Sequence, residues 1–129
     1  MKTNFKNLFT GILLLVFTAI ISSSYTFKST SEKALLPTAL KITVLDELGN
    51  YVESAEVTIY GNEEDFKASE NAVMEMQLTD KKGRVTFKGL EPKSYYVDVV
   101  KGKKTNYGAA QLTPQLEEGR FNKVNIIIE

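Results

Sequence analysis

The stretch Leu40-Lys41-Ile42-Thr43-Val44 decides the fold of this chain, because its side chains alternate strictly between apolar and polar. Leu40, Ile42 and Val44 fall on one face, and Lys41 and Thr43 fall on the other. Alternation with a period of two is typical of a β-strand that is buried on one face and exposed on the other. The sequence from residue 40 onward therefore predicts a domain built from strands.

The same alternation recurs at turn-punctuated intervals to the end of the chain. It predicts further strands at residues 52–60, 72–78, 84–88, 95–100, 107–112 and 121–128. The last of these points Val124, Ile126 and Ile128 inward. The turn residues 47–50 predict that the first two strands form a hairpin. Seven short strands without a long helix predict an all-β, antiparallel β-sandwich of two sheets.

Two of the predicted strands need comment. Residues 70–79 alternate as a strand does, yet their Glu, Ala and Met content also favours a helix. We favour the strand and allow a short helical turn from Glu64 to Ser69. Residues 95–100 are apolar on both faces, so we expect this strand to lie centrally in its sheet.

The N-terminus has the three parts of a secretory signal peptide. Lys2 and Lys6 form a basic start, residues 8–21 are strongly apolar, and small serines follow at 22–24. We expect a signal peptide over residues 1–24, a polar flexible tether over 25–38 and one folded domain over 39–129. An uncleaved membrane anchor is the alternative, because the uncharged stretch is just long enough to cross a bilayer.

Composition restricts the possible functions. The chain has no Cys, His or Trp, which removes most catalytic and metal chemistry, and lipid attachment through cysteine is not available. Basic and acidic residues balance at 16 each, so the exported form without Lys2 and Lys6 is slightly acidic. Nucleic acid is therefore not an expected partner. We expect a secreted or periplasmic protein without a cofactor.

Several of these segments together resemble a known family. The matching pieces are Ile42–Asp46, Ala55–Ile59, Thr79–Phe87, Gly89–Pro92 and Tyr96–Val99. With them the sequence resembles a carboxypeptidase regulatory-like domain, a transthyretin-like or prealbumin-like β-sandwich related to Cna-B-type domains. The resemblance implies an accessory or interaction module of an exported protein. One departure is Lys93-Ser94, where the family usually has Gly before the Tyr strand.

Enzymatic activity is not expected. The hydrolases of the transthyretin-like type rely on histidines and on a Tyr-Arg-Gly-Ser terminus, whereas this chain has no His and ends at Ile126-Ile127-Ile128-Glu129. The neighbouring carboxylates of Glu63, Glu64 and Asp65 lie in a polar stretch, without the burial that would raise the pKa of a general acid. No catalytic residue is therefore assigned.

The resemblance to Cna-B adhesin domains also implies a possible covalent cross-link. In those domains a first-strand Lys forms an isopeptide bond with a last-strand Asn beside a buried Glu. Lys41 and Asn125 are the matching candidates, but Val99 or Val100 stands where the Glu is expected. A structural adhesin-type domain with a Lys–Asn bond is therefore an alternative function.

Three tyrosines are candidates for binding. Tyr60, Tyr96 and Tyr107 fall outside the faces assigned to the core, and tyrosine rings suit sugar stacking or protein recognition. They could instead cover strand edges or complete the core of the opposite sheet. Calcium at Asp46 or Asp80 is also conceivable, although turn capping by these carboxylates is favoured. We expect a non-catalytic module that makes protein contacts in the envelope or outside the cell, with carbohydrate binding as the alternative.

Overall fold

The structure is a computed structural model that describes residues 36–108 and 111–129. The expected signal peptide and the tether up to residue 35 lie outside the described residues. Within the ranges that are described, no helix has the length and apolar character needed to cross a membrane.

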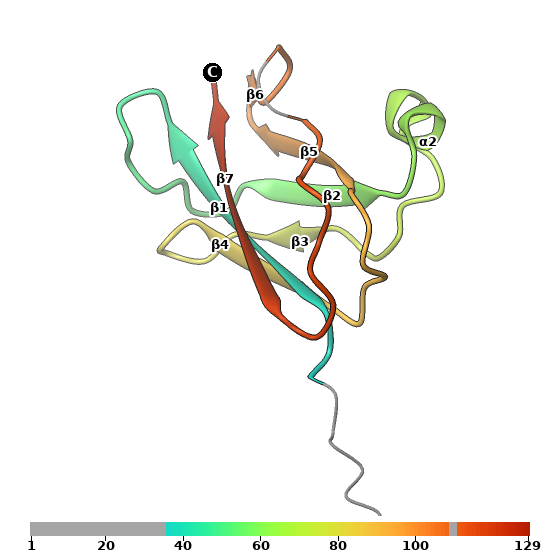
Figure 1. Cartoon of the computed structure of the whole chain (residues 1–129). Helices are drawn as coiled ribbons and strands as arrows, with labels where there is room; N and C mark the ends of the chain where they lie inside the picture. Colours follow the sequence, from blue (N-terminus) through green and yellow to red (C-terminus); the bar gives the residue numbers. More distant parts are fainter. Residues whose placement is uncertain (1–35, 109–110) are drawn as a thin grey trace, which may run out of the picture. The chain divides into compact units, whose positions relative to one another are not determined.

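Two β-sheets form the domain, as Figure 1 shows. One sheet has three strands in the order β4-β1-β7, and the other has four strands in the order β3-β2-β5-β6. Among the described residues the strands are β1 (Ala39–Asp46), β2 (Glu56–Tyr60), β3 (Gln77–Leu78), β4 (Arg84–Lys88), β5 (Tyr96–Lys101), β6 (Lys104–Thr105) and β7 (Phe121–Ile128), and the helix is α2 (Glu63–Ala68). The predicted all-β sandwich is confirmed.

The core lies between the inner faces of the two sheets. Inward side chains of β1, β2, β5 and β7 have almost no exposure, and the predicted alternation of these strands is confirmed. Phe87 and Tyr95 are the largest fully buried side chains. The Tyr95 hydroxyl donates to the carbonyl of Glu91 and accepts from its amide, which ties the Glu91 turn to the core. β5 has neighbours on both sides, so its expected central place is also confirmed.

One strand pairing differs from the predicted antiparallel arrangement. β4 pairs antiparallel with β1, but β7 pairs parallel with β1, with Lys41 opposite Lys123 and Thr43 opposite Asn125. Parallel neighbours need a long crossover, and the chain builds the whole second sheet between β1 and β7. Alternation specifies which face of a strand is buried and leaves its direction open.

The predicted hairpin between the first two strands is wrong. The chain pairs with β1 only briefly after the turn, through the bridge between Leu45 and Tyr51. At Ser54 it takes a left-handed conformation with φ 57° and crosses to the other sheet as β2. The hydroxyl of Thr79 holds this crossover, because it accepts from the amide of Ala55 and donates to the carbonyl of Val52.

The strand predicted at residues 72–78 is reduced to the two residues of β3. The allowed helical turn is present as α2, which begins at the cap Asn62 and ends at Ser69 in a left-handed conformation. The buried side chain of Phe66 packs from α2 against the sheet, so this helix covers the outer face of β2 and β5.

The strand predicted at residues 107–112 is also wrong. Leu112 makes only an isolated bridge with Tyr96, residues 109–110 lie outside the described residues, and β6 forms earlier, in the predicted polar loop. Gly102 allows the tight turn from β5 into β6, with φ +59°. The buried side chain of Asn106 then bonds the backbone of Val97 and Val99 in place of a continuing strand.

Candidate functional site

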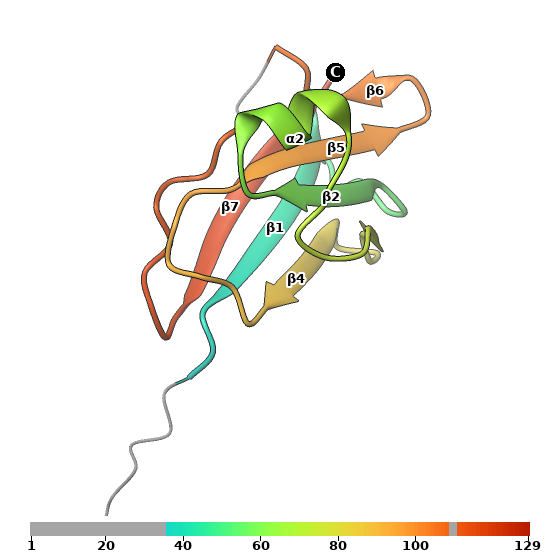
Figure 2. The ribbon, with the colours of Figure 1, turned by 90° about the vertical axis from the view of Figure 1, so that its right-hand side faces the viewer.

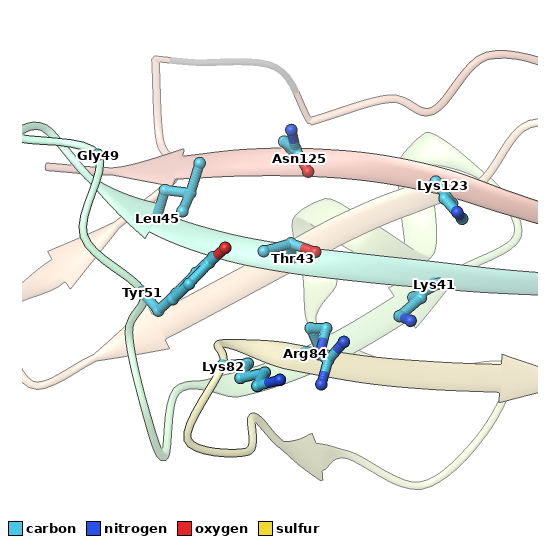
Figure 3. Close-up of a pocket in the computed structure, with 9 residues that line it drawn as sticks. All are labelled: Lys41, Thr43, Leu45, Gly49, Tyr51, Lys82, Arg84, Lys123 and Asn125. Atoms are coloured by element: carbon cyan, nitrogen blue, oxygen red, sulfur yellow. The ribbon is translucent and has the colours of Figure 1, made fainter.

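The outer face of the β4-β1-β7 sheet is hollowed, and we call this depression the basic hollow. It has a volume of about 430 Å³ and opens to solvent. Figure 3 shows side chains from all three strands and from two turns projecting into it. Its lining residues are Lys41, Thr43, Leu45, Gly49, Tyr51, Lys82, Arg84, Lys123 and Asn125.

Positive charge dominates this face. The side chains that β1, β4 and β7 turn to solvent are Lys41, Thr43, Leu45, Arg84, Thr86, Lys88, Phe121, Lys123, Asn125 and Ile127. Lysine and arginine are frequent in this set and Asp and Glu do not occur in it. Among the described residues only Arg84 of these cations forms an ion pair, with Asp80, and the surplus of positive charge creates a positive potential over the hollow. Tyr51 and Leu45 add apolar surface at one end.

The turn between β3 and β4 positions two of the cations. Asp80 accepts hydrogen bonds from the amides of Lys82 at 2.8 Å and Arg84 at 3.0 Å, and its carboxylate lies 3.7 Å from the Arg84 guanidinium. The Arg84 amide is the main cause that lowers the pKa of Asp80 below its usual value. Asp80 therefore stands at the rim of the hollow as a turn cap.

The opposite end of the hollow is shaped by a second capped turn. Asp46 accepts from the amides of Leu48 and Asn50, both at 2.9 Å, and the bond from Asn50 lowers the pKa of its carboxyl. This turn brings Tyr51 to the rim. Both carboxylates that were considered for calcium thus cap turns. In the part of the chain that the structure describes, no group of three acidic residues could hold a metal ion.

The structure brings Lys41 and Asn125 to the same face. Both line the basic hollow, and they are diagonal neighbours, because Lys41 is opposite Lys123 and Asn125 is opposite Thr43. The prediction that Lys41 faces away from the core is confirmed. None of the residues that line the hollow is acidic. Formation of an isopeptide bond requires a carboxyl group that transfers protons. The residues that line the hollow do not supply one.

The three candidate tyrosines gather on the other sheet, around α2. Phe66 lies 5.9 Å from Tyr60, 5.5 Å from Tyr96 and 6.4 Å from Tyr107, measured between ring centroids. Tyr60 is only 4% exposed, so its expected exposure is wrong; the helix that covers it was not anticipated as a lid on this face. Tyr96 is half-buried, and Tyr107 alone is mainly exposed, at 63%.

One carboxylate lies on the same face of the second sheet as these tyrosines. Asp98 is opposite Thr58 on β2, and its Oδ1 atom is buried without a hydrogen-bond partner among the described residues. Burial raises the pKa of Asp98 above its usual value. The pKa of Tyr60 is also raised, first by burial and then by the charge of Asp98.

Sequence reasoning missed most of the basic hollow. Lys41 and Asn125 were singled out, but Lys82, Arg84 and Lys123 were not. The signal was present, since the outward positions of three separate predicted strands are basic. This signal could be recognised only once the order of the strands in the sheet was known. The alternating pattern does not specify that order.

The two sheets form a β-sandwich fold of the Cna-B or prealbumin-like type, as comparison with solved structures shows. Neither the family models nor the curated proteins give a match to the sequence. The streptococcal ancillary pilin is similar in structure, with a TM-score of 0.54 and 17% identity, over 74% of this chain and 33% of that one. The major pilin subunit of Bacillus cereus has a TM-score of 0.51 and 12% identity, over 71% and 28%. The chain thus spans between 28% and 33% of these pilins, and the likeness concerns the fold.

Proposed function

We propose that this chain is a non-catalytic, exported accessory module, of the carboxypeptidase regulatory-like kind, that makes protein contacts through the basic hollow. The partner surface is an acidic polypeptide. We infer that the protein acts in the cell envelope or outside the cell, because a signal peptide is expected at its N-terminus.

The observation that carries the proposal is the charge of the outer face of β4-β1-β7. The chain as a whole has equal numbers of basic and acidic residues, 16 of each, so an excess of one sign on one face is a local feature. Here Lys41, Lys82, Arg84 and Lys123 line one hollow, and Asp80 at its rim is engaged with turn amides. Complementary charge across an interface accelerates encounter and selects the partner. Tyr51 beside these cations supplies the aromatic contact that is frequent at protein interfaces.

The fold supports a binding or structural role over catalysis. Two pilins share the architecture at low identity. The two acidic turns that flank the hollow are used for capping, and the tyrosines expected to bind sugar are largely packed around Phe66. The outer face of β4-β1-β7 then remains open for recognition.

A binding assay tests the proposal. A fluorescently labelled poly-glutamate peptide is titrated with the purified protein and with the double variant Lys41→Gln/Lys123→Gln, and anisotropy reports binding. Two exposed ion pairs of about 0.7 kcal/mol each amount to an affinity loss of about tenfold. The wild-type affinity should also weaken as salt is raised, because the charges are at the surface.

The matched control is Lys101→Gln/Lys103→Gln, which removes the same charge from the β5–β6 hairpin on the other sheet. This control should bind as the wild-type protein does, apart from the small effect of net charge. Equal weakening in both double variants would mean that net charge alone drives binding, and the proposed role of the hollow would then be wrong.

A further inference from the structure

A second charged surface has the opposite sign. The segment from Glu63 to Glu75, which we call the acidic segment, has Glu63, Glu64, Asp65, Glu70 and Glu75 against the single base Lys67. Lys67 is bound to Glu63 at 2.7 Å. Within the described residues, the carboxylates of Glu64, Glu70 and Glu75 form neither an ion pair nor a hydrogen bond, and all three are exposed.

The acidic segment is held in a defined shape. Asn62 caps α2 by accepting from the amide of Asp65, and the Asp65 carboxylate in turn accepts from the side chains of Asn62 and Asn71. Phe66 anchors the helix on the outer face of the β3-β2-β5-β6 sheet. The free carboxylates therefore project from a fixed platform, which lowers the entropy lost when a partner binds them.

The acidic segment and the basic hollow lie on opposite sides of the sandwich. The helix α2 lies on the outer face of the β3-β2-β5-β6 sheet, the hollow lies on the outer face of the β4-β1-β7 sheet, and the core fills the space between the inner faces. In Figure 2 the helix α2 lies in front of β2 and β5, while β1 and β7 lie behind them. One molecule therefore cannot place its own acidic segment in its own hollow, but two molecules can join these surfaces.

We propose that the basic hollow of one copy receives the acidic segment of a second copy, so that the domain associates head to tail. This inference rests on the proposed function and identifies the acidic partner as a second copy of the chain. The chain itself supplies the complementary surface. Among the described residues, Arg84 is the one cation lining the hollow that forms an ion pair, and Glu63 is the one carboxylate of the acidic segment that does. A contact between two different patches is heterologous, and because the patches lie on opposite sides it leaves both ends open for further copies.

Sedimentation velocity tests the contact with two variants that each remove one side of it. Lys41→Gln/Lys123→Gln removes charge from the hollow, and Glu64→Gln/Glu70→Gln/Glu75→Gln removes charge from the acidic segment. Sodium chloride is varied from about 20 mM to about 300 mM, across which the screening length falls from about 20 Å to about 6 Å.

The wild-type protein should associate at low salt and dissociate at high salt. Each variant alone should associate at least about tenfold more weakly. An equimolar mixture of the two variants retains one intact hollow and one intact acidic segment, so it should form a complex that stops at one molecule of each. Lys101→Gln/Lys103→Gln should associate as the wild type does.

A wild-type protein that stays monomeric at low salt, or a mixture that forms no complex, would overturn the head-to-tail contact. Self-association of either variant at the strength of the wild-type protein would overturn it as well. The poly-glutamate titration separates this failure from that of the proposed function: a monomeric protein whose hollow still binds the peptide has an acidic partner other than itself.

Discussion

Gly83 closes the turn that presents Lys82 and Arg84 to the basic hollow, and Gly83→Ala is a sharp test of the packing described. Its φ is +66°, and a Cβ built on it would lie 2.5 Å from the carbonyl oxygen of Val44. The Gly83 carbonyl also accepts from the Val44 amide at 2.7 Å. A side chain at this position must therefore push a turn away from the central strand β1.

The magnitude follows from two contributions. A left-handed conformation costs an alanine about 1–2 kcal/mol, partly offset by about 0.4–1 kcal/mol from the stiffer unfolded chain. Overpacking against backbone adds about 1–3 kcal/mol. Gly102→Ala is the matched control, because its φ is +59° and nothing lies within 4 Å of the added Cβ. The loss at Gly83 should exceed the loss at Gly102 by about 2 kcal/mol.

Urea denaturation followed by circular dichroism measures both losses as shifts of the midpoint at constant slope. Gly83→Ala should also weaken binding to the acidic peptide, since Lys82 and Arg84 move with the turn. Equal losses in the two variants would refute the close approach of this turn to β1.

Three further predictions concern the supports of the fold. Thr79→Val should cost about 2 kcal/mol, because the amide of Ala55 and the carbonyl of Val52 lose their buried partner, whereas Thr86→Val on the open face should stay within about 0.5 kcal/mol in the same denaturation experiment. Phe66→Ala should cost about 2–4 kcal/mol and remove hydrogen-exchange protection from the Phe66 and Ser69 amides; unchanged protection would show that α2 does not depend on this anchor. Asp98→Asn should stabilise the protein at neutral pH. The raised pKa of Asp98 means that wild-type stability is recovered as pH falls through that pKa, so the advantage of the variant should vanish near pH 4, and an advantage independent of pH would contradict the buried charge.

Much of the fold could be predicted because burial of one face gives β1, β4, β5 and β7 a side-chain pattern with a period of two. The capped turn at Asp80 was equally legible, since a carboxylate before Gly83 specifies both its hydrogen bonds and its left-handed residue. These features depend on residues close together in the chain, and the physical reason for each is local.

The remaining features depend on contacts between distant residues. The crossover at Ser54 is fixed by Thr79, and the helix α2 is fixed by Phe66 against Tyr96. The basic hollow exists because β4 and β7 flank β1, with Lys123 directly opposite Lys41. The order of the strands therefore had to be known before the positive charge of the hollow could be recognised. Tyr60 was misjudged for the same reason, as α2 covers its ring.

Amide NMR spectra of the isotope-labelled protein, titrated with poly-glutamate, locate the binding surface without any substitution. A binding face on β4-β1-β7 predicts chemical-shift changes at outward residues such as Thr43, Arg84 and Asn125. The amide signals around Tyr60 and Tyr96 should stay unchanged. Shifts confined to the tyrosines around α2, with the three-stranded sheet unaffected, would contradict it.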